Sequence, residues 1–142
     1  MKKTRINDCH IIELDKIEGD DSRGSLSVIE KDSIPFESKR IYYLYDVPSD
    51  ARRGGHAHKE LHQFLIPVSG SFDIILNDGK KEQTFTMNKP NKGLYLCPGI
   101  WREIENFSSG AVCLVLASEV YLEEDYIRDF HTFLRLKLPK IQ

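Results

Sequence analysis

The stretch RRGGHAHKELHQ, residues 52–63, decides the fold of this chain. It lies within a succession of short runs typical of strands. Alternate residues of a strand point to the same face, so His56 and His58 should project together into whatever the sheet encloses. We interpret the pair as a candidate site rather than as two unrelated histidines.

The segment resembles the first motif of the cupin barrels, which has a His-x-His pair, an acidic ligand four or five residues later, and then a glycine. Here the ligand position falls on His62 or Gln63, and Gly70 follows. A second cupin-like segment, GLYLCPGIWREIEN, spans residues 93–106, and in it Arg102 replaces the expected third histidine. The resemblance implies an all-β fold, a double-stranded β-helix (jelly-roll) barrel.

The replaced histidine argues against a metal site. A metal-bearing cupin usually presents three imidazoles and one carboxylate to a transition metal. A guanidinium stays protonated and cannot coordinate. We therefore expect no metal and interpret His56 and His58 as acid/base groups, since an unperturbed imidazole titrates at about 6.5. Two alternatives stay open: a metal site of His56, His58 and His62, and a hydrogen-bonded histidine pair that only lines the barrel.

Length and charge narrow the classes of function. The 142 residues fit one domain, residues 1–142, with a single core. The formal net charge of −2, from 20 basic and 22 acidic residues, gives no basic field for nucleic acid. A small anionic ligand held by a few local arginines remains compatible.

The cysteines and the N-terminus indicate where the protein works. Cys9, Cys97 and Cys113 are odd in number and far apart, which favours a reducing compartment without a disulfide framework. The N-terminus lacks the continuous apolar core of a signal peptide, and no stretch approaches the ~20 apolar residues of a membrane span. We expect a cytoplasmic protein that does not bind membranes.

Short strands are expected over most of the chain, separated by Gly, Pro, Asn and Asp. The predicted strands are Leu26–Glu30, Ile41–Tyr45, Gln63–Val68, Phe72–Leu76, Glu82–Thr86, Gly93–Cys97, Trp101–Glu105 and Val112–Ala117. Asn77-Asp78-Gly79 predicts a hairpin, because Asp-Gly tolerates the positive φ angles of a tight turn.

The C-terminal tail changes to helical spacing. Apolar residues recur with that period from Glu123 to Lys137, and acidic residues stand at the start, where a helix favours them. The pattern predicts one amphipathic helix, or a pair of shorter turns, packed on the barrel.

Three tyrosines lie on one predicted strand. Tyr43 and Tyr45 share a face opposite to that of Tyr42. Both faces carry apolar residues, so the periodicity does not decide which one looks into the barrel.

Taken together, the segments resemble the nucleotide-sugar 3,4-ketoisomerases, small WxcM-like cupins that act on dTDP-4-keto-6-deoxyglucose. The resemblance covers nearly the whole chain. It rests on the order and joint presence of RGSL at 23–26, RIYYLY at 40–45, RGGHAH at 53–58, NDG at 77–79, GLY at 93–95, WRE at 101–103, VLAS at 115–118 and DYIR at 125–128.

The resemblance implies the roles of particular residues. His56 and His58 would be the catalytic pair, with His58 as the base and His56 as its partner. The substrate-binding residues would be Tyr43, Arg53, Arg23 and Arg102. It also implies a homodimer that exchanges N-terminal strands, and a place in the biosynthesis of unusual 3-amino deoxysugars such as those of lipopolysaccharide O-antigens.

The reaction itself needs few groups. Moving a ketone from C4 to C3 of the sugar requires a base for the C3 proton, a group that stabilises the enediolate, and an acid that returns a proton at C4. One imidazole within reach of both carbons can perform both proton steps. No cofactor is expected, and the chain has no glycine-rich dinucleotide motif. The alternatives are a non-catalytic nucleotide-sugar-binding cupin and a cupin sugar epimerase.

Overall fold

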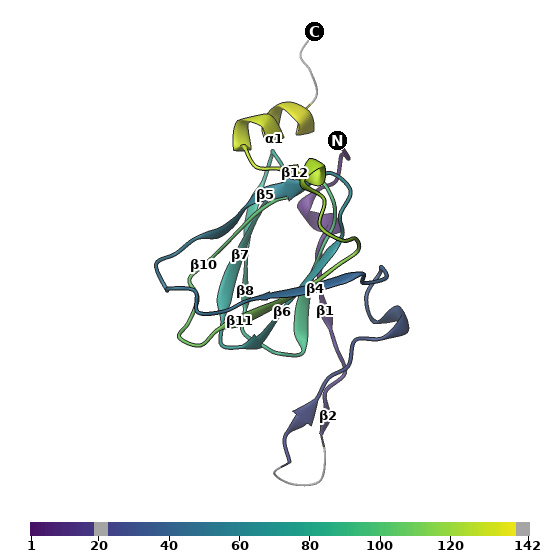
Figure 1. Cartoon of the computed structure of the whole chain (residues 1–142), viewed down its shortest axis with the longest axis vertical. Helices are drawn as coiled ribbons and strands as arrows, with labels where there is room; N and C mark the ends of the chain where they lie inside the picture. The colour runs from purple at the N-terminus through teal and green to yellow at the C-terminus, as the bar shows by residue number, and fades with distance from the viewer. Residues whose placement is uncertain (19–22, 139–142) are drawn as a thin grey trace.

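Two five-stranded antiparallel sheets face each other and form a barrel in the computed structural model, which describes residues 1–18 and 23–138 (Figure 1). The strand orders are β1-β9-β6-β11-β4 and β12-β5-β10-β7-β8. The elements are β1 (His10–Glu13), β2 (Ile17–Glu18), β3 (Ser25–Leu26), β4 (Arg40–Leu44), β5 (Arg53–His58), β6 (Gln63–Ser69), β7 (Phe72–Asn77), β8 (Glu82–Met87), β9 (Lys92–Leu96), β10 (Trp101–Glu105), β11 (Val112–Ala117), β12 (Tyr126–Ile127), α1 (Phe130–Lys137) and the 3-10 turns Ile6–Asp8, Lys31–Ser33 and Glu123–Asp125. The predicted all-β jelly-roll with a C-terminal helical segment is confirmed.

The core follows from strand alternation. In β7, Phe72, Ile74 and Leu76 are buried, whereas the residues between them are only partly buried. Glycine is required where the chains approach most closely: a Cβ on Gly93 would lie 2.1 Å from the ring of Phe64 on the neighbouring strand β6. The absence of a side chain at position 93 leaves room for the buried Phe64 ring.

Seven of the eight predicted strands are confirmed to within one residue at each end, as β4 and β6 to β11, whereas β5 was not among the predicted strands. The predicted strand Leu26–Glu30 is wrong, because only Ser25–Leu26 pair, as β3. Beyond β3 the chain turns at Lys31, where φ is +48°, and Ser33 Oγ donates to the Glu30 carbonyl at 2.7 Å. These local contacts replace ladder hydrogen bonds.

The predicted hairpin between β7 and β8 is confirmed. Its turn holds Gly79 at φ +91°, and Asp78 Oδ1 accepts the backbone N–H groups of Lys80 at 2.9 Å and Lys81 at 2.8 Å. The other carboxylate oxygen of Asp78 accepts the Ile6 N–H at 3.1 Å, which ties the N-terminal turn to this hairpin.

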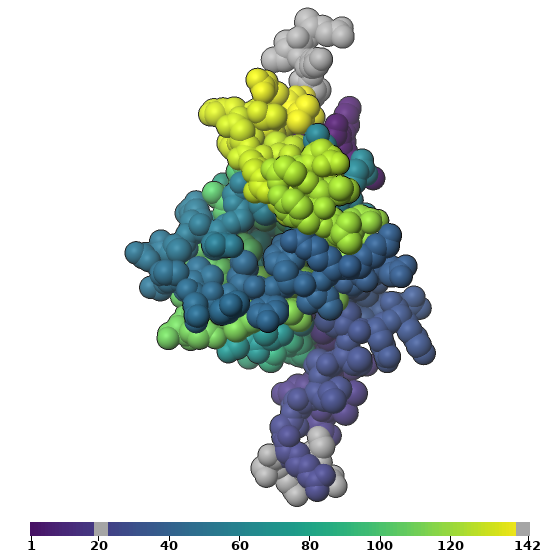
Figure 2. All heavy atoms as spheres, viewed as in Figure 1, coloured from purple at the N-terminus to yellow at the C-terminus, as the bar shows by residue number. Residues whose placement is uncertain are grey.

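Strands β2 and β3 form a narrow arm that projects from the barrel (Figures 1 and 2). Its apolar side chains are exposed, Ile17 by 54% and Leu26 by 58%. An isolated two-stranded ribbon is at best marginally stable in water. Among the described residues, no other element buries the apolar side chains Ile17 and Leu26 of the arm.

The tail departs from the single helix predicted for Glu123–Lys137. Glu123–Asp125 form a 3-10 turn, and Tyr126 and Ile127 then pair with β5 as β12. Helix α1 begins only at Phe130, after Asp129 accepts the Thr132 N–H at 2.9 Å. The pairing with β5 outweighs the helical pattern. Helix α1 packs its buried Phe133 near Trp101 on the outside of the barrel.

No helix within residues 1–18 and 23–138 is long and apolar enough to cross a membrane.

Candidate active site

A cavity of about 320 Å³ opens between the two sheets. Both sheets contribute to it, through strands β4, β6 and β11 on one side and β5, β10 and β12 on the other. The lining residues are Arg40, Tyr42, Leu44, Arg53, Gly54, His56, Gln63, Leu65, Arg102, Ile104, Val115, Tyr126 and Arg128. An apolar barrel interior that carries this many cations favours an anionic, polar ligand.

The two histidines of the sequence motif form part of a hydrogen-bonded row. His56 Nε2 lies 3.1 Å from His58 Nε2, and His58 Nδ1 lies 3.0 Å from Asp125 Oδ2. His56 lines the cavity, whereas His58 has no exposed surface and does not line it. The pair is therefore ordered: His56 faces a ligand, and His58 lies between it and the carboxylate.

Both imidazoles are neutral at pH 7. Burial, with the positive charges of Arg102 and Arg128, lowers the pKa of His56 to about 3. Burial, followed by the charge of Arg102, also lowers the pKa of His58. A neutral imidazole has a free nitrogen lone pair and is the form that accepts a proton.

Arg102 lies opposite the histidines, where β10 pairs its backbone with His56 of β5. Its side chain is 2% exposed and hydrogen-bonds the Gln63 amide oxygen and the Ile100 carbonyl. Burial lowers the pKa of Arg102 to about 10, so the guanidinium keeps its charge at pH 7. It is a fixed positive charge in the barrel interior.

A tyrosine completes this group, and it is Tyr42 rather than Tyr43. Gln63 Nε2 donates to the Tyr42 hydroxyl at 3.0 Å, which leaves the Tyr42 proton free to be donated. Burial raises the pKa of Tyr42, so the phenol keeps that proton. The structure does not bring the predicted Tyr43 to the cavity: it lies on the outer face of β4, 58% exposed, against Tyr45. Neighbouring residues of a strand face opposite sides, so an error of one position changes the face.

The remaining predicted residues are divided between the cavity and the arm. Arg53 and Arg102 line the cavity together with His56. Arg23 is exposed on the β2–β3 arm and is not among the lining residues of its own chain.

The alternative metal set of His56, His58 and His62 is not brought together. His62 Nδ1 hydrogen-bonds the Tyr95 hydroxyl at 2.7 Å and stacks on Phe36, whereas the next residue, Gln63, enters the cavity. Within the part of the chain that the structure describes, no group of three or more His, Cys, Asp or Glu side chains could hold a metal ion.

Sequence reasoning missed several residues of the tail that shape the site. Tyr126 packs on both histidines, with ring centroids 5.0 Å from His56 and 4.3 Å from His58. Arg128 stacks over Tyr126 at 4.2 Å and makes a two-pronged ion pair with Glu123, at 2.7 and 2.8 Å. The signal was the run DYIR at 125–128, which marked the family without indicating a role.

Comparisons of the sequence and of the fold with known proteins point to the same family. Residues 7–138 match the family model described as FdtA: WxcM-like, C-terminal. A TDP-4-oxo-6-deoxy-alpha-D-glucose-3,4-oxoisomerase from Aneurinibacillus thermoaerophilus is 48% identical over 114 residues, which are 80% of this chain and 82% of that protein. The crystal structure of a 3,4-ketoisomerase from Helicobacter canadensis superposes with a TM-score of 0.87 at 50% identity, over 92% of this chain and 97% of that one. QdtA, a sugar 3,4-ketoisomerase from Thermoanaerobacterium thermosaccharolyticum solved with TDP, gives 0.89 at 40% identity, over 94% and 96%.

Proposed function

Since the chain belongs to the WxcM-like FdtA family, we propose that it is a nucleotide-sugar 3,4-ketoisomerase that converts dTDP-4-keto-6-deoxyglucose into a dTDP-3-keto-6-deoxyhexose. The observation that carries the proposal is a neutral imidazole, His56, that lines a cationic cavity and is backed by His58 and Asp125. The product would enter the biosynthesis of 3-amino deoxysugars, such as those of O-antigens.

The base in this scheme is His56, which reverses the order expected from the sequence. Only a group that reaches the substrate can take its C3 proton. His56 lines the cavity, whereas His58 is fully buried and separated from it. His56 would remove the proton at C3 and return one at C4, and His58 would be its hydrogen-bonded partner.

Arg102 and Tyr42 are placed to stabilise the charge that develops on the sugar. An enediolate places negative charge on the C3 and C4 oxygens in turn. A buried guanidinium and a phenol that keeps its proton, both hydrogen-bonded to Gln63, offer preorganised donors to those oxygens. These groups can supply the electrostatic stabilisation, so the scheme needs neither a metal nor a redox cofactor.

The diphosphate would be bound by the cations nearer the mouth of the cavity, Arg40, Arg53 and Arg128. Planar guanidinium groups suit phosphate oxygens. Anion binding also helps catalysis, because the charge of Arg128 is one cause of the low pKa of His56. Neutralising that charge raises the pKa and makes His56 a stronger base in the complex than in the free protein.

The function is tested by turnover in the absence of metal. Chelator-treated protein is incubated with dTDP-4-keto-6-deoxyglucose, and carbon NMR follows the position of the ketone. We expect the carbonyl signal to move from C4 to C3. Binding of the substrate, measured by calorimetry, without any change in the ketone would favour a non-catalytic binding protein, whereas inversion at a carbon with the ketone kept at C4 would favour an epimerase.

We also propose a homodimer in which the β2–β3 arms are exchanged. The arm exposes Ile17 and Leu26, and the outer face of edge strand β4 exposes Ile41, Tyr43 and Tyr45. Exposed apolar patches and unpaired strand edges favour association. Strand β1 pairs with β9 of its own chain, so the exchanged element in this proposal is the arm.

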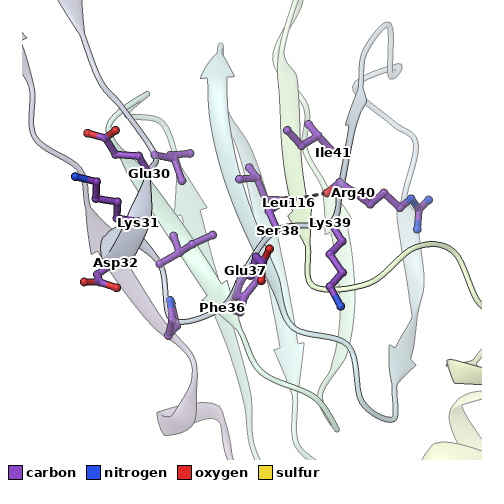
Figure 3. Close-up of a pocket in the computed structure, with 13 residues that line it drawn as sticks. Glu30, Lys31, Asp32, Phe36, Glu37, Ser38, Lys39, Arg40, Ile41 and Leu116 are labelled. Carbon is purple, nitrogen blue, oxygen red and sulfur yellow. Dashed lines mark hydrogen bonds between the residues drawn. The ribbon is translucent and has the colours of Figure 1, made fainter.

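We propose that the second copy binds in a groove beside edge strand β4. It measures about 1000 Å³ and is lined by residues 29–32, 34–41 and Leu116. Figure 3 shows Glu30 and Asp32 on one side of the groove and Ile41 and Leu116 on the other. In such a dimer, Arg23 on the arm of one protomer would lie near the barrel of its partner, where it could bind the substrate.

The dimer predicts the effect of removing the apolar side chains of the arm. The double variant Ile17→Ser/Leu26→Ser is expected to change the mass measured by light scattering from twice 16.4 kDa to 16.4 kDa. Lys16→Ser, an exposed position next to β2, is the control and should leave the mass unchanged. A wild-type mass of 16.4 kDa would contradict the dimer.

A further inference from the structure

Asp125 stands at the end of the histidine row that points away from the cavity. Its two carboxylate oxygens have different partners: Oδ2 faces His58 Nδ1 at 3.0 Å, and Oδ1 accepts the Glu60 N–H at 2.8 Å. We propose that Asp125 is a positioning residue of the isomerase, which holds His58 in the Nδ1–H tautomer and thereby keeps His56 ready to accept a proton. The inference deepens the proposed function and rests on it.

The tautomers follow from the order of donors and acceptors. An ionised carboxylate only accepts hydrogen bonds, so His58 Nδ1 must donate its N–H to Asp125. The Nε2 atom of the neutral His58 ring is then an acceptor. Across the 3.1 Å contact between the two rings, His56 Nε2 must therefore be the donor. This leaves Nδ1 of His56 unprotonated, in a ring that lines the cavity.

The backbone holds this carboxylate in a fixed place relative to the histidines. The Asp125 carbonyl accepts the Lys59 N–H at 3.0 Å, and the next residue, Tyr126, pairs with His58 in the β12–β5 ladder. The turn and the short strand at the start of the tail therefore fix Asp125 against the strand that carries the histidines. A helix begun at Glu123 would not provide this ladder.

The row also provides a place for positive charge. When His56 takes the C3 proton at Nδ1, its Nε2 proton can pass to His58 Nε2, and the charge then lies beside Asp125. The charged groups that act on the histidines are otherwise cations, namely Arg40, Arg102 and Arg128, with Glu123 as an exposed carboxylate farther out. The Asp125 carboxylate opposes them at hydrogen-bond distance.

Asp125→Asn is the first test. An amide can donate to His58 Nδ1 and so turn the row to the opposite tautomers, in which His56 Nδ1 is protonated. We expect kcat to fall by about 100-fold or more, as carboxylate loss behind a histidine base does elsewhere, with KM within about threefold. Asp125→Glu keeps the charge and is expected to recover at least about tenfold of the lost kcat. Glu124→Gln is the matched control: it removes an exposed carboxylate from the same turn and should leave kcat unchanged.

Nitrogen-15 NMR of the histidine rings gives a readout that a merely structural role would not move. The wild-type protein should show His58 as the Nδ1–H tautomer, and Asp125→Asn should show it as Nε2–H. An Nε2–H tautomer in the wild type, an unchanged tautomer in the variant, or a variant with wild-type kcat would each overturn the proposal. The wild-type spectrum needs no variant to fold and no turnover, so it separates a failure of this inference from a failure of the proposed function.

Discussion

His56→Asn is expected to lower kcat by about 10³- to 10⁴-fold, toward the upper end of what a general base contributes, because this imidazole would perform both proton transfers. Asparagine has a similar size and can still donate to His58, so the fold and the cavity should persist. TDP should therefore bind to the variant with an affinity within about threefold of the wild type, as expected when an interaction with the reacting carbons alone is lost. Turnover is measured by NMR and TDP binding by calorimetry.

His62→Asn is the matched control for this experiment. His62 belongs to the same sequence segment but hydrogen-bonds Tyr95 away from the cavity. Its replacement should leave kcat within about twofold of the wild type, as for a residue that makes no contact with the reacting atoms. A His56→Asn protein that retains turnover, or a His62→Asn protein that loses it, would remove His56 from the role of base.

Tyr42→Phe is the second large effect. Removing one preorganised donor to a developing oxyanion typically costs about 10²- to 10³-fold in kcat. The phenyl ring of the variant would keep the packing, but Gln63 would lose its hydroxyl acceptor, and the sugar oxygen would lose a donor. We expect kcat to fall within that range, and the melting temperature to fall by a few degrees because the buried Gln63 amide loses its acceptor.

Tyr43→Phe provides the comparison on the same strand. Its hydroxyl lies on the exposed outer face of β4, so turnover should be unchanged. Parallel kinetics of the two variants decide which tyrosine serves the reaction. A larger loss for Tyr43→Phe would contradict the placement of the site inside this barrel.

The barrel could be predicted from the sequence because strand alternation and turn residues are local signals. The Asp78-Gly79 turn and the runs that form β4 and β6 to β11 are examples. The face of β4 could not be predicted, because Tyr42 and Tyr43 are both aromatic and neighbours on a strand. Their faces are decided by contacts that lie far apart in the sequence: Tyr42 bonds Gln63 of its own sheet, and Gln63 in turn bonds Arg102 of the second sheet.

The secondary structure of the C-terminal tail could not be predicted from the sequence either. Its apolar spacing predicts a helix from Glu123, yet residues 126 and 127 pair with β5. Pairing between strands that lie far apart in the sequence leaves no local signature. Because Asp125 reaches His58 only through this pairing, the carboxylate end of the histidine row was missed as well. The His-x-His pair itself was predicted, although the order of base and partner required the three-dimensional structure.

Proton transfer by His56 between C3 and C4 is best measured by proton NMR of the reaction in deuterated water. Chelator-treated wild-type protein and the His56→Asn variant are each supplied with dTDP-4-keto-6-deoxyglucose. We expect a 3-keto product in which C4 carries the hydrogen that the enzyme delivered, with deuterium there in proportion to solvent exchange at the imidazole, and a rate that is lower by about 10³- to 10⁴-fold in the variant. A 3-keto product formed at the same rate by His56→Asn, or no product from the wild type, would contradict proton transfer by His56.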